Sequence, residues 1–190
     1  MPRQNPRVQY TRDALRCALL ELLLEKPVKH ITVTDVCARA GINRSTFYLH
    51  YKDVYDLLEQ MENDLIDEMG RTFSTQPSAS LQGHIEAMLC VVQARRPLCL
   101  AILSEHGNPQ FVKQLGRLTR EGFLQHWRSL FPQAPERLLE LVYAFSTSGA
   151  SAVIEQWLLA DCNEPPEQIA HLLSLFAASC LNSCKTMLDS

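Results

Sequence analysis

A run of polar and basic side chains follows a glycine in the stretch AGINRSTFYLHYKD, residues 40–53. Arginine, lysine and side-chain hydroxyls are groups that often contact phosphates and the edges of bases. The stretch could therefore bind a polyanion through Arg44, Ser45, Thr46, Tyr48, His50 and Lys52. The same residue types also occur on ordinary solvated helices, so the surrounding sequence has to decide between these two interpretations.

Short helices with their own start and stop signals would position this stretch. Thr32 followed by Asp35 predicts a capping box at the start of one helix, and Gly41 can end that helix in a left-handed conformation. Asn43 is suited to cap the next helix, and Asp53 the one after it. The pattern therefore predicts a helix, a glycine turn, a second short helix and a fresh start.

The second short helix, expected from Arg44 to Tyr51, has two different faces. Phe47 and Tyr51 lie four residues apart, so both aromatic side chains would pack inward. The outward face is mainly polar, and it consists of Ser45, Thr46, Leu49 and Lys52, flanked by Tyr48 and His50.

This arrangement is typical of a helix-turn-helix unit, whose second helix enters the major groove while the preceding helix lies on the DNA backbone. Thr34, in the first turn of the preceding helix, is placed to contact phosphate. Arg44 is the candidate for bidentate recognition of guanine, and Leu49 for contact with a thymine methyl group. The candidates for phosphate contacts on the second helix are Tyr48, His50 and Lys52.

The segment ITVTDVCARAGINRSTFYLHYKDVYDLL resembles the DNA-binding domain of the TetR family. The resemblance covers residues 10–58 and includes Thr32, Val36, Ala40, Gly41, Ile42, Phe47, Tyr48, His50 and Tyr51. Cys37 departs from it by replacing an alanine, and Val54 stands where many members carry a lysine. Lys52 is expected to compensate for that missing phosphate contact. Further on, ILSEHGNPQF and SGASAVIEQWLLADCNEPPEQIAHLL are similar to a subgroup that includes regulators acting with dihydroxyacetone kinase-like partner proteins.

Charge is distributed unevenly along the chain. Residues 1–55 contain nine lysines and arginines and five acids, whereas the whole chain has a net charge of -3. A basic head on an acidic body indicates that a polyanion would bind the head alone.

Helical periodicity extends over almost the whole chain, so we expect an all-α fold of nine helices in the TetR-like arrangement. After the first helix from Thr11 and the three starts above, prolines mark later starts, and the expected helices are 80–94, 97–104, 109–130, 135–161 and 165–188. We expect a helix-turn-helix domain over residues 1–53 and a ligand-binding and dimerisation domain over residues 54–190. The sequence has no long apolar run and no signal core, which favours a cytoplasmic protein without a membrane span.

The last two expected helices are apolar over more than one face, which suggests that they pair with a second copy in a four-helix arrangement. Such stripes more often form an intramolecular core, but the resemblance to a dimeric family favours pairing. The candidate interface residues are Phe145, Gly149, Ala152, Val153, Leu173, Phe176 and Cys180.

The middle of the chain mixes apolar walls with a few polar groups, which suits a small-molecule pocket. Core or surface roles are equally compatible with these positions. The candidate ligand-binding residues are Met88, Cys99, His106, Phe123, His126 and Trp127.

The sequence contains no motif typical of an enzyme, such as a nucleophile elbow, a Walker loop or a Rossmann fingerprint, and we expect no cofactor. Cys180 and Cys184 would share a helix face, but no histidine or acid beside them completes a metal site. The resemblance implies a homodimeric repressor that binds a palindromic operator and is released from it by a small-molecule effector. The alternative is a DNA-binding regulator or coactivator controlled by a protein partner.

Overall fold

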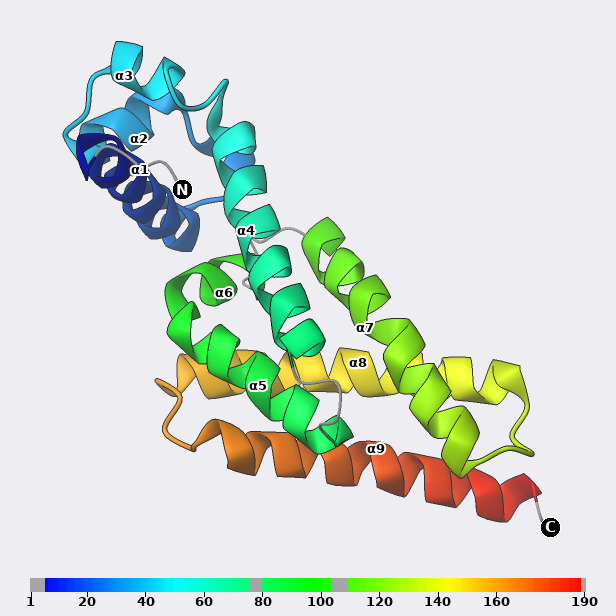
Figure 1. The fold of residues 1–190 in the computed structure, drawn as a ribbon. Helices are drawn as coiled ribbons and strands as arrows, with labels where there is room; N and C mark the ends of the chain where they lie inside the picture. The colour runs from blue at the N-terminus through cyan, green and yellow to red at the C-terminus, as the bar shows by residue number, and fades with distance from the viewer. Residues whose placement is uncertain (1–5, 76–79, 104–108, 189–190) are drawn as a thin grey trace.

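The computed structural model describes residues 6–75, 80–103 and 109–188, and within these ranges all regular structure is helical (Figure 1). The α-helices are α1 (Pro6–Glu25), α2 (Val33–Ala40), α3 (Arg44–Tyr48), α4 (Val54–Thr75), α5 (Leu81–Ala94), α6 (Arg96–Leu103), α7 (Pro109–Leu130), α8 (Glu136–Leu159) and α9 (Pro166–Leu188). One turn of 3-10 helix, Val28–His30, links α1 to α2. Over these described ranges, the predicted all-α fold with nine α-helices is confirmed.

A head and a body are joined by one long helix. Helices α1, α2 and α3 form the head, and α4 leaves it to enter the body, where α8 and α9 lie side by side along one edge (Figure 1). Helix α5 packs on α9, and α7 packs on α8. Helix α6 contacts both α8 and α1, so it connects the body to the head a second time.

The capping signals in the sequence form the contacts they predict. Thr32 Oγ1 accepts a hydrogen bond from the Asp35 amide at 3.1 Å, and Asp35 Oδ2 accepts one from the Thr32 amide at 3.0 Å. This capping box begins α2, and Gly41 ends it with a φ of 67°, in the left-handed region that favours glycine. Asp53 Oδ1 accepts from the Asp56 amide at 2.9 Å and so caps α4.

Helix α3 is shorter than predicted, because it ends at Tyr48 and not at Tyr51. The chain tightens there: the amide of Leu49 bonds to the carbonyl of Thr46, three residues back, at 3.3 Å. The next helix also begins close by, since the Lys52 amide already donates to Asp56 Oδ2 at 2.8 Å. Tyr51 nevertheless reaches the core, where its side chain is 2% exposed.

The hydrophobic core runs through the head and the body without a break. One cluster of buried residues includes Leu19 of α1, Phe47 of α3, Leu57 of α4, Ile102 of α6 and Leu173 of α9. A second, smaller cluster lies between α7, α8 and α9. Val54, at the domain boundary expected from the sequence, is itself part of the main cluster, so the core crosses this boundary.

We expect the side chain of Asn43 to stabilise the start of α3 by accepting a hydrogen bond from the Thr46 amide. Replacing it with alanine removes the acceptor of the Thr46 amide and should lower the free energy of unfolding by about 1 kcal/mol. Urea unfolding followed by circular dichroism measures this change. Asn43→Asp is the control, because a carboxylate also caps well; equal losses in both variants would show that the cap has no such role.

Candidate functional site

The outward face of α3 is open to solvent, whereas its aromatic face is not. The Leu49 side chain just after α3 is 80% exposed and that of Tyr48 is 51% exposed, while Phe47 is fully buried. The rings of Phe47 and Tyr51 pack with centroids 5.7 Å apart. The predicted inward and outward faces are therefore present: Arg44, Ser45, Tyr48, Leu49 and Lys52 are exposed, and Thr46 and His50 are partly exposed.

The first turn of α3 is held together by one amide oxygen. Asn43 Oδ1 accepts from the Thr46 amide at 2.8 Å, from Thr46 Oγ1 at 2.9 Å and from Ser45 Oγ at 2.6 Å. The hydroxyl protons of Ser45 and Thr46 are thus engaged inside the protein, and their oxygens are left as acceptors. Neither the sequence pattern nor the spacing indicated this use of the two hydroxyls.

Thr34 lies in the first turn of α2 and is exposed. Beside it, the Asp35 carboxylate accepts from the Thr32 amide and from Lys26 Nζ at 3.0 Å, and these contacts, the amide first, lower the pKa of Asp35 to about 2. Asp35 is therefore ionised at neutral pH, and its charge is balanced by Lys26.

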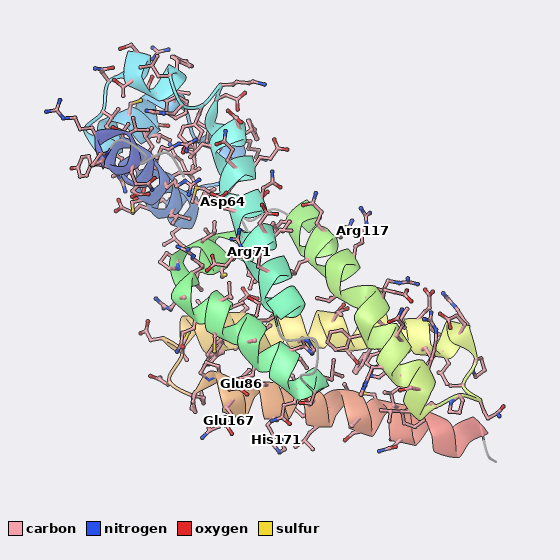
Figure 2. The ribbon with its side chains drawn as sticks, viewed as in Figure 1. Asp64, Arg71, Glu86, Arg117, Glu167 and His171 are labelled. Carbon is pink, nitrogen blue, oxygen red and sulfur yellow. The ribbon has the colours of Figure 1, made fainter. Side chains whose placement is uncertain are left out.

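The basic residues of the head divide into paired and unpaired groups. Arg39 binds Glu21 at 3.1 Å and Glu25 at 2.9 Å, and Arg16 binds Asp64 of α4, labelled in Figure 2, at 2.5 Å. Arg44 and Lys52 form no ion pair within the described ranges. An interaction with the Tyr48 hydroxyl raises the pKa of Arg44. Arg44 and Lys52 therefore place positive charge without an ion pair on α3 and just after it.

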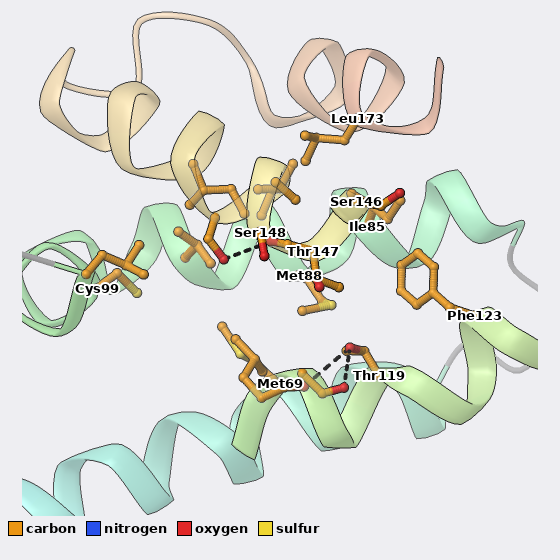
Figure 3. A pocket seen from close by; sticks show the side chains of 18 of the residues that line it. Met69, Ile85, Met88, Cys99, Thr119, Phe123, Ser146, Thr147, Ser148 and Leu173 are labelled. Carbon is orange, nitrogen blue, oxygen red and sulfur yellow. Dashed lines mark hydrogen bonds between the residues drawn. The ribbon is translucent and has the colours of Figure 1, made fainter. Parts of the chain in front are cut away.

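A cavity of about 360 Å³ lies in the body between α4, α5, α6, α7, α8 and α9 (Figure 3). Of the candidate ligand-binding residues, Met88, Cys99, Phe123 and Trp127 line it. His126 does not: it is exposed, because its neighbour Trp127 turns inward and consecutive residues on a helix point about 100° apart. We therefore remove His126 from the candidates. His106 lies outside the described residues.

The polar groups of the cavity come mainly from hydroxyls on α7 and α8. The Tyr143 hydroxyl donates to the Gly116 carbonyl oxygen at 2.5 Å and lies 3.0 Å from Thr119 Oγ1. Ser146 Oγ is buried and has no partner among the described residues. The sequence did not indicate Thr119, Tyr143 and Ser146 as cavity residues, because isolated hydroxyl residues on amphipathic helices do not predict a pocket.

An apolar face is exposed along α8 and α9. We call it the pairing face, and it consists of Leu141, Phe145, Gly149, Ala152, Leu172, Leu175 and Phe176. Phe145 is 68% exposed and Phe176 is 52% exposed. On α8 the members recur every three or four residues and so form one stripe along the helix.

The candidate interface residues do not all lie on this face. Phe145, Gly149, Ala152 and Phe176 are exposed on it, and Val153 and Cys180 are partly buried beside it. Leu173 was wrong as an interface residue: it is 9% exposed, belongs to the main core and lines the cavity. Leu141, Leu172 and Leu175 are exposed members that the sequence interpretation missed.

Comparison with known proteins gives matches over both parts of the chain. The family model TetR_C_8, described as "Transcriptional regulator C-terminal region", matches residues 79–179. The HTH-type transcriptional regulator YxbF of Bacillus subtilis (strain 168) is 32% identical over 126 residues, which is 62% of this chain and 33% of YxbF. The HTH-type transcriptional repressor BepR of Brucella suis biovar 1 (strain 1330) is 30% identical over 61 residues, 32% of this chain and 29% of BepR. The matches thus span about a third of the length of each curated relative.

The fold has its own relatives among solved structures. A TetR transcriptional regulator from Streptococcus agalactiae 2603V superposes with a TM-score of 0.63 at 21% identity, over 92% of this chain and 95% of that one.

A short capped helix displayed on a helical head, joined to a larger helical body, defines a helix-turn-helix transcriptional regulator. The chain belongs to the TetR family. In the part of the chain that the structure describes, no helix is both long enough and apolar enough to span a lipid bilayer.

Proposed function

We propose that this chain is a homodimeric repressor that binds a palindromic DNA operator through α3 and releases it when a small molecule fills the body cavity. The observation that carries the proposal is the outward face of α3, where Arg44 and Lys52 are exposed and unpaired within the described ranges. Thr34, Ser45, Thr46, Tyr48, Leu49 and His50 complete the proposed DNA surface. Unpaired cations next to exposed hydroxyl and apolar groups suit phosphate and base contacts respectively.

The pairing face supports a dimer. Two exposed phenylalanines on neighbouring helices form an apolar surface of the kind that marks a protein–protein contact. A two-fold pair of heads would place its two copies of α3 on half-sites about 34 Å apart, or a multiple of that distance. The small residues Gly149 and Ala152 would let the partner's helix approach closely.

The cavity supports control by a small molecule over control by a protein partner. Its volume of about 360 Å³ lies within the range that such ligands occupy, and its walls are mainly apolar with a few hydroxyls. Ser146 Oγ would gain a hydrogen-bond partner from a ligand there. Because α4 lines the cavity and also packs on α1, a ligand could shift the head.

Selection of binding sites from random DNA duplexes tests the proposal most directly. We expect a palindromic sequence to be enriched, because a two-fold dimer reads the same half-site twice. Enrichment of no sequence, or of a single unrepeated half-site, would contradict the proposed homodimeric operator binding.

Two substitutions separate base recognition from phosphate contact. Arg44→Ala should weaken binding to the selected site by about 1–3 kcal/mol and relax the preference at one base position. Lys52→Ala should weaken binding to all sequences by similar amounts and reduce the dependence on salt concentration. Fluorescence anisotropy on the selected duplex and a scrambled duplex, over a range of salt, measures both effects. Parent-like binding by both variants would show that the assigned contacts are wrong.

A further inference from the structure

The body cavity has a single charged residue in its lining among the described residues. Lys113 of α7 lines the cavity and is also exposed, so it lies at the opening to solvent. Of the lining residues that the structure describes, none is an aspartate or a glutamate. Burial raises the pKa of Cys99 to about 12 and raises that of Tyr143, so both stay neutral at physiological pH. Among the described lining residues, the ammonium group of Lys113 is therefore the only charged group, and the rest of the lining is mainly apolar.

Within the described residues, no acidic side chain forms an ion pair with Lys113. On the same helix, Arg120 binds Glu140, and Arg128 binds Glu121 at 2.9 Å and Glu136 at 2.6 Å. Lys113 and Arg117 have no acidic partner in the parts of the chain that the structure describes.

Lys113 and Arg117 also lie four residues apart on α7, so they share one side of the helix and repel each other. Arg117, labelled in Figure 2, is exposed to solvent one turn beyond Lys113. An anion bound between them would relieve this repulsion. A cavity with low-dielectric walls and charge of one sign focuses the field on a ligand of the opposite sign.

We propose that the effector is an amphipathic monocarboxylate, whose apolar chain fills the cavity and whose carboxylate binds Lys113 at the opening. This proposal rests on the proposed function, because it names the class of ligand for the same cavity. The alkyl chain of the ligand would contact Met69, Met88 and Phe123, which project into the cavity (Figure 3). At about 360 Å³ the cavity is at the small end of the range of volumes for small-molecule pockets, which favours a ligand with an alkyl chain of medium length.

A cationic ligand fits the same lining less well. Aromatic rings attract cations through their faces, and Phe123, Trp127 and Tyr143 are all in the lining. These rings pack edge to face on one another, however, with centroids 5.9 to 6.2 Å apart. A cation would also meet Lys113 with no acid among the described lining residues to compensate.

Three probes with the same chain and different headgroups test the proposal: decanoate, decanol and decylamine. Each is added to the full chain below its critical micelle concentration, and binding is followed by calorimetry. Tryptophan fluorescence gives a second signal, to which both Trp127 of the cavity lining and Trp157 contribute. We expect decanoate to bind about fivefold more tightly than decanol, because Lys113 is exposed and its ion pair is partly screened. Decylamine should bind most weakly.

Variants of Lys113 test whether this residue causes the preference for decanoate over decanol. Lys113→Gln should reduce decanoate binding to the level of decanol and leave decanol binding unchanged, whereas Lys113→Arg should keep the preference for decanoate. Since Lys113 is exposed, neither variant should change the far-ultraviolet circular dichroism.

Equal binding of decanoate and decanol to the parent, or no binding of any probe, would overturn the proposed ligand class. A preference for decanoate that persists in Lys113→Gln would overturn the role of Lys113. If decanol released the selected DNA as well as decanoate did, the ligand class would be wrong while the effector-controlled repressor would stand.

Discussion

Phe47→Ala is expected to lower the free energy of unfolding by about 3–5 kcal/mol, the range observed when a large buried aromatic side chain is removed. Phe47 is fully buried, and its ring lies 5.6 Å from that of Tyr48 and 5.7 Å from that of Tyr51. The substitution would therefore leave a cavity directly beneath the side of α3 that we propose faces DNA. Urea unfolding, followed by circular dichroism, measures the loss.

Leu49→Ala is the matched control for Phe47→Ala. Leu49 is also apolar and lies two residues away, but it is 80% exposed, so its truncation should change stability by no more than about 0.5 kcal/mol. Its effect should instead appear in DNA binding, as a weaker preference at one thymine. A similar loss of stability in both variants would mean that Phe47 does not anchor α3.

Phe145→Glu is expected to separate the proposed dimer. Phe145 is 68% exposed in the single chain and is the most exposed of the large apolar residues on the pairing face. A two-fold interface contains each residue twice, so the substitution removes two aromatic contacts and adds two carboxylates. At about 2 kcal/mol for each aromatic contact, the dimer Kd should rise by about three orders of magnitude.

Sedimentation equilibrium over a dilution series measures the association of the Phe145→Glu variant, and anisotropy measures its binding to the selected operator. Leu130→Glu is the control, because Leu130 of α7 is 57% exposed and lies outside the pairing face. A Phe145→Glu chain that stays dimeric, or a parent chain that is monomeric at micromolar concentration, would refute the assignment of this face.

The elements of the fold could be predicted well because their signals are local. Capping residues such as Thr32 and Asn43 satisfy amides within three residues of themselves, so the sequence alone is enough to identify them. The same is true of Pro109 and Pro166, which are the first residues of α7 and α9.

The candidate sites were harder to predict because they depend on how helices pack. Leu173 and Phe176 are both apolar and lie within one turn of α9, yet Leu173 is buried and Phe176 is exposed. Periodicity gives the apolar side of a helix, but the position of α5 on α9 decides which part of that side is covered. Lys113 was missed for a similar reason, since its place at the cavity opening depends on five other helices.

The end of α3 shows the limit of a local signal. Phe47 and Tyr51 are spaced as on a helix and both are buried, which supports a helix that continues to Tyr51. The competing start of α4, where Asp53 and Asp56 bind nearby amides, ends the helix one turn earlier. Side-chain spacing predicted the burial correctly and the backbone incorrectly.

The unbroken core has a mechanical consequence. Met69 of α4 and Ile102 of α6 line the cavity, and both helices also pack on α1. A ligand that displaced either side chain would press on a helix that itself contacts α1 of the head. For the proposed effector, α4 and α6 would therefore provide a direct path of contacts from the cavity to the head.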